Sequence, residues 1–273
     1  MTRLREAELL IAGVWADVLG RDRIEVHEDF FALGGRSLQV AKVIDRIRRL
    51  TGVALDVRAF FETPTVAGLA QQVAAGPHEV PAGQFAGVIE LRRGRASGRP
   101  IFCIHPIGGL AWCYSAILPY VDPGHPVHGI QATERNGGLR PVRELADRYA
   151  GLVRSTHPGG PYVIAGWSLG GVLAYEVAGR IEAAGQRVDL VAIFDARPHD
   201  APPSPDGYTG PAVCISASRT IERLGCPELA WKAYLPDAGH HTVEAEHDTM
   251  MTEEVMRQAG PILRAALARL PGP

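Results

Sequence analysis

The sequence predicts a small all-helical domain followed by a larger domain in which helices wrap a mostly parallel β-sheet. Three observations support this prediction. Apolar residues recur at helical spacing over residues 1–75. Residues 76–86 carry two prolines, two glycines and no periodicity, which is typical of a linker. Over residues 87–273, apolar strand-like runs alternate with helical segments, which indicates a parallel sheet.

The first domain is expected to be a four-helix bundle. Over residues 5–19 the apolar side chains fall on one helical stripe, and Gly20 ends that segment. A second helix is expected over residues 37–50, followed by a short turn over residues 57–61. Pro64 is then expected to open the last helix, because proline is favoured at the first helical position.

The second domain is expected to contain strands that are buried on both faces, because its apolar runs are short and nearly continuous. The expected strands are 88–92, 101–105, 127–131, 162–166, 190–195, 212–216 and 242–246. The expected helices are 110–118, 142–155, 168–184 and 253–270. Strands and helices alternate along the chain, so we expect a mostly parallel sheet wrapped by helices.

Composition argues against several classes of protein. The formal net charge of −2 gives no reason to expect nucleic acid or a membrane as a partner. No apolar run approaches the roughly 18 residues of a membrane span, and the N-terminus lacks a signal-peptide layout, so a cytoplasmic protein is expected. The sequence contains no Cys-x-x-Cys pair, so a cysteine metal site is not expected. Buried free thiols are expected instead at Cys103, Cys113, Cys214 and Cys226.

The strongest single motif is Gly-Trp-Ser-Leu-Gly-Gly, from Gly166 to Gly171. It follows an expected strand and opens an expected apolar helix. A Gly-x-Ser-x-Gly turn in this context is the nucleophile elbow of the α/β-hydrolase fold, where the serine lies on a strained turn. The hydroxyl also lies near a helix N-terminus, which favours negative charge. We therefore predict that Ser168 is a nucleophile.

A serine nucleophile needs a base, and the base needs an acid that orients it. In this fold the chain order is serine, acid, histidine, and the acid ends a later strand. Asp195 ends the apolar run 191–195 and is therefore the predicted acid. Asp189, which precedes that strand, and Asp200, in a proline-rich loop, are weaker candidates for the acid.

The histidine base is expected after the last strand of the domain. His247 directly follows the expected strand 242–246, so it is the predicted base. His240 and His241 lie at the start of that strand, which is the wrong end for a base. A structural or surface role is expected for both of them.

Two backbone amides are expected to stabilise the negative charge that develops during acyl transfer. One belongs to Leu169, the residue after the nucleophile, and the other lies in a loop after an early strand. In that loop, residues 105–109, Ile107 supplies the candidate amide because Pro106 has none. His105 precedes the serine in an early strand, so we expect it to hold the loop in shape rather than to act as a base.

A second serine, Ser37, closes the loop that begins at Asp29 and starts a helix. No acid or histidine is spaced as a base for it, so nucleophilic catalysis is not expected there. Taken alone, the pattern predicts a helix N-cap. The glycines before it, Gly34 and Gly35, nevertheless expose the serine to a modifying enzyme.

Residues 29–38, Asp-Phe-Phe-Ala-Leu-Gly-Gly-Arg-Ser-Leu, resemble the motif of peptidyl carrier domains from nonribosomal peptide synthetases. The resemblance covers residues 5–75. It implies that Ser37 receives a covalent 4′-phosphopantetheine arm from a phosphopantetheinyl transferase. Arg36 replaces the usual His or Asp of the motif. That departure bears on recognition by the transferase or by partners and leaves the attachment atom unchanged.

Residues 87–273 resemble the type I thioesterases of the same systems. The matching features are Leu91-Arg92-x-Gly, the run 99–106 with Gly108-Gly109, the elbow motif, Asp195, Trp231 and His247-x-x-Met250. The resemblance implies release of a carrier-bound peptidyl thioester through an acyl-serine intermediate, by hydrolysis or by macrocyclisation. It also implies that condensation and adenylation domains of a synthetase lie upstream as partners.

The thioesterase-like domain departs from the family after Asp195. Only residues 196–210 separate Asp195 from the next expected strand, whereas family members usually insert a helical lid of several tens of residues there. A short connection leaves the site open to water. We therefore hypothesise that this chain favours hydrolysis over cyclisation.

Two further functions are consistent with parts of the sequence. One is a carrier scaffold for tailoring enzymes with a recruiting, non-catalytic hydrolase domain, and the complete set Ser168, Asp195 and His247 argues against it. The second is the carrier and thioesterase of a polyketide synthase. The double phenylalanine before Leu-Gly-Gly favours the peptide system.

Overall fold

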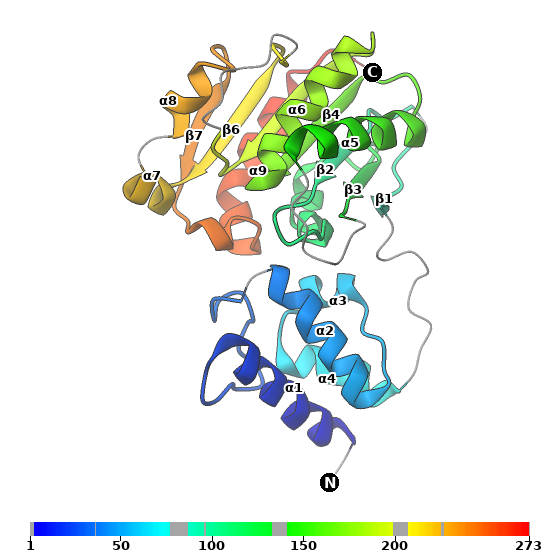
Figure 1. The fold of residues 1–273 in the computed structure, drawn as a ribbon, viewed down its shortest axis with the longest axis vertical. Helices are drawn as coiled ribbons and strands as arrows, with labels where there is room; N and C mark the ends of the chain where they lie inside the picture. The colour runs from blue at the N-terminus through cyan, green and yellow to red at the C-terminus, as the bar shows by residue number, and fades with distance from the viewer. Residues whose placement is uncertain are drawn as a thin grey trace. The chain divides into compact units, whose positions relative to one another are not determined.

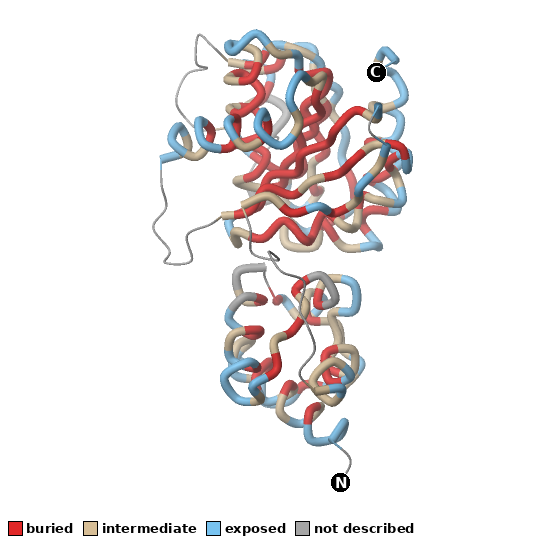
Figure 2. Tube along the Cα trace, turned by 90° about the vertical axis from the view of Figure 1, so that its right-hand side faces the viewer, coloured by how far each residue is buried: buried red, intermediate tan, exposed pale blue. Residues whose placement is uncertain are grey.

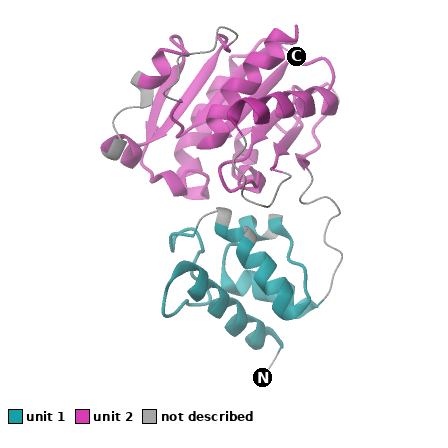
Figure 3. Cartoon of the chain, in the orientation of Figure 1, with its two compact units in different colours: residues 1–85 teal, residues 86–273 magenta. Residues whose placement is uncertain are grey.

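The computed structural model describes residues 3–35, 37–76, 87–95, 97–132, 141–198, 207–224 and 227–272. The chain divides into two compact units, residues 1–85 and residues 86–273 (Figure 3). Of the expected linker 76–86, all but Gly76 lies outside the described residues. Each unit has its own buried core (Figure 2).

The described part of unit 1 is a bundle of four helices (Figure 1). They are α1 (Arg3–Leu19), α2 (Ser37–Thr51), α3 (Val57–Glu62) and α4 (Val66–Ala75). The ring centroid of Trp15 lies 4.8 Å from that of Phe30 and 5.9 Å from that of Phe60. All three side chains are fully buried. An aromatic cluster therefore stabilises the bundle.

Two expectations for unit 1 are wrong in detail. Residues 57–61, expected as a turn, belong to helix α3. Pro64 does not open the last helix, because α4 begins at Val66 and Thr65 is its N-cap. The Thr65 side chain accepts a hydrogen bond from the Gly68 amide at 3.1 Å. A threonine oxygen can cap a helix in this way and proline cannot, so the cap determines where α4 starts.

The described part of unit 2 holds one seven-stranded sheet in the order β1-β3-β2-β4-β5-β6-β7 (Figure 1). Strand β1 is antiparallel to β3, and every other neighbouring pair is parallel. The strands are β1 (Val88–Arg92), β2 (Ile101–Ile104), β3 (Val127–Ile130), β4 (Tyr162–Trp167), β5 (Val188–Phe194), β6 (Ala212–Ala217) and β7 (Gly239–Val243). The predicted mostly parallel sheet is thus confirmed.

Helices cover both faces of this sheet, as a parallel sheet requires. Helices α5 (Val142–Thr156) and α6 (Leu169–Ala183) pack together on one face, and α9 (Glu253–Ala268) packs with the 3₁₀ helix η1 (Trp112–Tyr120) on the other (Figure 1). Strands β4 and β5 are buried at every residue. None of the helices that the structure describes is long and apolar enough to cross a membrane.

Three features of unit 2 differ from the expectation. The last strand runs from Gly239 to Val243 and not over residues 242–246. Two short helices, α7 (Ser218–Leu224) and α8 (Pro227–Lys232), lie between β6 and β7, where no helix was expected. The expected helix 110–118 is a 3₁₀ helix that contains Pro119. Proline cannot donate the amide hydrogen bond that a continuing α-helix needs.

The cysteines that the structure describes are buried thiols, as expected. Cys103, Cys113 and Cys214 are all buried and lie outside any disulfide, and Cys226 lies outside the described residues. Burial raises the pKa of the Cys103 and Cys113 thiols. Both thiols therefore stay protonated and unreactive at neutral pH.

Candidate active site

Strand β4 runs directly into α6 through a sharp turn at Ser168. The backbone of Ser168 has φ 57° and ψ −127°, which is strained for a residue with a side chain. A Cβ atom on Gly166 would lie 1.9 Å from the Gly170 carbonyl oxygen, and one on Gly170 would lie 2.1 Å from the Ile104 carbonyl oxygen. The glycines of the motif therefore permit a turn this tight, which leaves Ser168 partly exposed.

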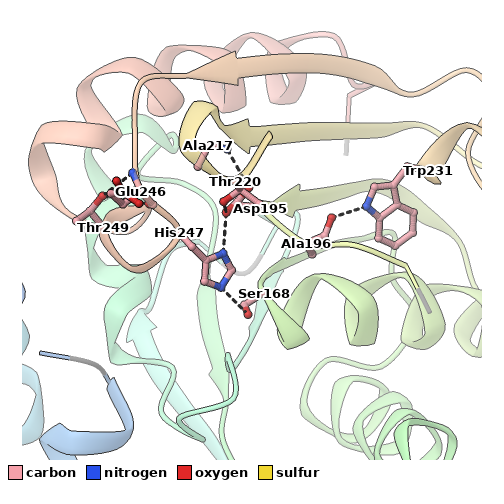
Figure 4. A network of polar contacts seen from close by, with 9 residues as sticks. All are labelled: Ser168, Asp195, Ala196, Ala217, Thr220, Trp231, Glu246, His247 and Thr249. Carbon is pink, nitrogen blue, oxygen red and sulfur yellow. Dashed lines mark hydrogen bonds and ion pairs between the residues drawn. The ribbon is translucent and has the colours of Figure 1, made fainter. Parts of the chain in front are cut away.

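His247 lies between Ser168 and Asp195 (Figure 4). Its Nε2 is 2.9 Å from Ser168 Oγ, and its Nδ1 is 2.6 Å from Asp195 Oδ2. A carboxylate only accepts hydrogen bonds, so Nδ1 carries the proton and Nε2 can accept the serine proton. The Asp195 side chain is 0% exposed and that of His247 is 38% exposed. The acid is thus shielded from water, while the histidine can be reached by a substrate.

Asp195 is held by two groups besides His247 (Figure 4). It follows β5 with a φ of 40°. Its Oδ1 accepts a hydrogen bond from the Ala217 amide at 2.9 Å, and its Oδ2 accepts one from the Thr220 hydroxyl at 2.6 Å. Thr220 lies on α7 and was missed in the sequence. The available signal was the helical spacing of Ile221 and Leu224 directly after a strand.

The turn that carries His247 is fixed by its own hydrogen bonds. The 3₁₀ helix η2 (His247–Thr249) begins there, and Glu246 and Thr249 form a capping box around it. The Glu246 amide donates to the Thr249 hydroxyl at 3.2 Å (Figure 4). The Trp167 ring also packs near the His247 imidazole, with 5.7 Å between the ring centroids. The imidazole is therefore oriented by its backbone and by a packed ring.

The two amides predicted to bind an oxyanion lie on segments that are tied together. Leu169 is the first residue of α6, so its amide has no acceptor within the helix. Ile107 lies in the loop after β2. The Tyr114 hydroxyl joins the two segments, because it donates to the Ile104 carbonyl at 2.6 Å and accepts from the Trp167 amide at 2.7 Å. Tyr114 therefore fixes the end of β2 against the elbow.

A hydrogen bond holds Ala196, the first residue of the connection after Asp195. The indole nitrogen of Trp231, on α8, donates to the Ala196 carbonyl at 2.7 Å (Figure 4). The Trp231 ring packs against Tyr175 and Tyr234, each at 5.7 Å between centroids. Residues 199–206 of this connection, and with them the weaker acid candidate Asp200, lie outside the described residues.

Asp189, His240 and His241 do not join Ser168 in the site. Asp189 is buried and forms two ion pairs. Its Oδ2 is 2.7 Å from Arg99 Nε and its Oδ1 is 2.6 Å from Arg187 Nε, so its charge is already neutralised. His240 and His241 lie within β7, not at its carboxyl end. Across the described part of the chain, no group of three or more His, Cys, Asp or Glu side chains is placed to hold a metal ion.

Ser37 is the first residue of α2, and its side chain lies outside the described residues. The described part of the loop before it, residues 29–35, is held by hydrogen bonds and close packing. Asp29 Oδ1 accepts two amide hydrogen bonds, at 2.7 Å and 3.0 Å. Gly34 has a φ of 91°, and a Cβ on Gly35 would lie 2.4 Å from the Phe30 ring. A serine at the N-terminus of a helix suits a phosphodiester anion, so these residues fit a phosphopantetheine attachment site.

Comparison with known families agrees with this two-part arrangement. Residues 10–73 match the phosphopantetheine attachment site family, and residues 99–209 match the thioesterase domain family. The chain therefore consists of a phosphopantetheine-binding carrier domain followed by a thioesterase domain of the α/β-hydrolase fold.

Several large synthetases resemble the chain. Malpinin synthetase of Mortierella alpina is 36% identical over 191 residues, which are 69% of this chain and 2% of that protein. Enterobactin synthase component F of Escherichia coli is 26% identical over 96% of this chain and 25% of that protein. The chain thus spans a quarter or less of these relatives. Among solved structures, the NocB thioesterase domain from the nocardicin cluster is 25% identical, with a TM-score of 0.56 over 67% of this chain and 99% of that domain.

Proposed function

We propose that this chain performs the terminal release of a carrier-bound peptidyl thioester in nonribosomal peptide synthesis. The observation that carries the proposal is the hydrogen-bonded series from Ser168 through His247 to Asp195, with 2.9 Å and 2.6 Å between the bonded atoms. In such a series the histidine removes the serine proton as the oxygen attacks. The match of residues 99–209 to thioesterase domains supports an acyl thioester as the substrate.

Within this proposal, residues 1–75 are the carrier domain and residues 87–273 the thioesterase domain. Ser37 is the attachment point of the arm, which a phosphopantetheinyl transferase installs, and upstream synthetase domains supply the peptidyl group. When bound, 4′-phosphopantetheine supplies the thiol to which the acyl group is joined. Ser37 contributes its hydroxyl oxygen to the phosphodiester and takes no part in the acyl transfer itself.

The first acyl transfer moves the acyl group from sulfur to Ser168. Ser168 Oγ attacks the thioester carbonyl carbon while its proton passes to His247 Nε2. Asp195 accepts the Nδ1 proton in a hydrogen bond and stabilises the imidazolium. The carbonyl oxygen gains the negative charge, for which the Leu169 and Ile107 amides are the proposed donors. The carbon–sulfur bond then breaks, and the Nε2 proton passes to the departing sulfur.

The second transfer moves the acyl group from Ser168 to an acceptor. Water, or an amine or hydroxyl group of the peptide, gives a proton to His247 Nε2 as it attacks the ester carbonyl. The ester bond breaks and the proton returns to Ser168 Oγ. Water gives a free acid, and a group of the peptide gives a ring.

We infer that water is the usual acceptor, because the connection 196–210 is too short for a lid that would exclude it. Product analysis with a peptidyl thioester should give mainly the linear acid. A predominantly macrocyclic product would contradict the inference.

Labelling with a fluorophosphonate tests the proposed nucleophile. The reagent should modify Ser168 of the wild-type chain and leave Ser168→Ala unmodified, as read by peptide mapping. A wild-type chain that folds but is not labelled would favour a non-catalytic recruiting domain instead.

A further inference from the structure

The loop after β2 contains a buried polar pair that the reaction above does not use. His105 is 4% exposed, and Tyr149, on α5, is 2% exposed. His105 Nε2 is 2.6 Å from the Tyr149 hydroxyl oxygen, and His105 Nδ1 is 2.6 Å from the Pro106 carbonyl oxygen. Burial of such polar groups is costly unless each of them is hydrogen-bonded. Here both ring nitrogens have partners.

The direction of these hydrogen bonds follows from their chemistry. A carbonyl oxygen only accepts, so His105 Nδ1 carries the proton and donates it to Pro106. Burial lowers the pKa of His105, which keeps the imidazole neutral. The Nε2 atom therefore accepts a hydrogen bond from the Tyr149 hydroxyl. The donors point one way, from Tyr149 through His105 to the Pro106 carbonyl, and bonds aligned in this way polarise one another.

The Pro106 carbonyl and the Ile107 N–H belong to a single peptide group. In a trans peptide these two groups point in opposite directions. The carbonyl accepts a second hydrogen bond from the Gly109 amide at 2.9 Å, so two donors hold it on the inner side of the loop. The Ile107 N–H of the same peptide group therefore points away from His105 and Gly109, and the Ile107 side chain is 61% exposed.

The rest of the loop entrance is already fixed. The Tyr114 hydroxyl joins the Ile104 carbonyl to the elbow, and Gly170 packs directly on the backbone of Ile104. The rotation of the Pro106–Ile107 peptide group is therefore the main freedom left to this part of the site. The hydrogen bonds from His105 Nδ1 and from the Gly109 amide to the Pro106 carbonyl both restrict this rotation.

We propose that Tyr149 and His105 are positioning residues, which orient the Pro106–Ile107 peptide group and so aim the Ile107 amide at the oxyanion. Neither side chain touches the substrate, and both act through that peptide group. The inference rests on the proposed function and adds to it the residues that build one half of the oxyanion hole. Because the amide acts on charge present only in the transition state, loss of its alignment lowers kcat and leaves KM unchanged.

The test compares Tyr149→Phe with wild type and with a matched control. Tyr162→Phe is the control, because it likewise removes one tyrosine hydroxyl that donates a hydrogen bond, in this case to the His157 backbone carbonyl at 2.7 Å. Loss of a whole oxyanion donor costs about 10²–10³-fold in kcat, so a misaligned donor should cost roughly tenfold. We expect that loss for Tyr149→Phe with a soluble acyl thioester, and wild-type kcat for Tyr162→Phe.

A second readout separates an oxyanion defect from a general one. Each chain is assayed with an ester substrate and with its thionoester, in which sulfur replaces the carbonyl oxygen and accepts amide hydrogen bonds poorly. The preference of wild type for the oxygen substrate should fall in Tyr149→Phe by the same factor as kcat. A loss of stability or of the base would lower both rates equally and leave the preference unchanged.

The His105 variants give an independent check should Tyr149→Phe fold poorly. An asparagine amide can take the place of Nδ1 as donor to Pro106, so His105→Asn should retain more of the oxygen preference than His105→Ala. An unchanged preference in Tyr149→Phe, or in both His105 variants, would overturn the inference while the proposed function stood. A wild-type chain that hydrolyses no acyl thioester would instead refute the proposed function, and this inference with it.

Discussion

Ser37 and Ser168 lie in nearly the same local sequence in two unrelated folds. Each belongs to a Gly-x-Ser-Leu segment, Gly35 to Leu38 and Gly166 to Leu169, and a helix begins at each segment. At Ser168 the fold adds His247 from the turn after β7 and Asp195 from the end of β5. The shared segment thus provides a hydroxyl at a helix start. In the proposed reaction, the reactivity of Ser168 comes from segments that are distant in the sequence.

The backbone also differs between the two sites. In the loop before Ser37, the positive φ of 91° falls on Gly34, which tolerates it easily. In the elbow, the positive φ of 57° falls on the serine itself, at a cost of about 1–3 kcal/mol. In the thioesterase domain the strained backbone is that of Ser168, which is hydrogen-bonded to His247. In the carrier domain the positive φ falls on a glycine and not on Ser37.

The largest expected effect separates the two serines. Ser168→Ala should lower kcat for a soluble acyl thioester by about 10⁶-fold, because the nucleophile is lost. Ser37→Ala should leave that rate unchanged, since a soluble thioester does not need the arm. Steady-state hydrolysis assays measure both. Comparable rates for wild type and Ser168→Ala would show that the two roles are wrongly assigned.

The next effect concerns the acid. Asp195→Asn should lower kcat roughly 10⁴-fold, because an amide at this position favours the wrong tautomer of His247. Asp189→Asn is the matched control, a buried acid near the other end of the same strand that pairs with Arg99. It should lower the melting temperature while the folded protein keeps its kcat. Equal losses of kcat in the two variants would argue against Asp195 as the orienting acid.

A smaller effect is expected for Thr220, which donates to Asp195 Oδ2 at 2.6 Å. Hydrogen bonds to charged groups contribute about 1.5–3 kcal/mol, so Thr220→Val should lower kcat by about tenfold or somewhat more. Thr220→Ser keeps the hydroxyl and should restore most of the rate. If serine and valine at this position gave the same kcat, the hydroxyl would have no role in holding the acid.

The smallest effect tests whether the two folds act separately. Thr65→Ala removes the N-cap of α4 and should destabilise unit 1 by about 1 kcal/mol. Hydrogen exchange of the α4 amides measures this change. Hydrolysis of a soluble thioester should remain at the wild-type rate, because it does not need the arm on Ser37 and every residue proposed for the acyl transfers lies in unit 2. A parallel loss of hydrolysis would mean that unit 2 depends on the stability of the carrier bundle.

The parts of the molecule that follow local rules could be predicted from the sequence. Strands β4 and β5 are buried at every residue, so their apolar runs were plain. Ser168 and Asp195 directly follow these two strands, and the elbow motif restricted the chain order. The predicted position of the last strand, 242–246, was wrong by three residues. The observed strand β7 lies at the edge of the sheet and is largely exposed. Exposure removes the apolar pattern on which the prediction depended.

The supporting residues could not be predicted, because their roles depend on tertiary contacts. Thr220 reaches Asp195 from α7, and the helical spacing of Ile221 and Leu224 indicates a helix there without indicating what the Thr220 hydroxyl contacts. In the sequence, Tyr149 and Tyr114 are aromatic residues with no motif around them. Only the fold brings the Tyr149 hydroxyl to His105 and the Tyr114 hydroxyl to the elbow. The residues of the reaction could thus be proposed from motifs, and the residues that orient them required the structure.

The most direct test of the central claim follows the acyl group between the two serines. The chain is incubated with a transferase and a peptidyl coenzyme A, and intact-mass analysis with peptide mapping is performed over time. We expect the acylated arm on Ser37, then a transient acyl ester on Ser168, then an unacylated arm and free acid. In Ser168→Ala the acyl group should stay on the arm. Equal lifetimes of the acylated arm in wild type and Ser168→Ala, or an arm attached to another residue, would contradict the account.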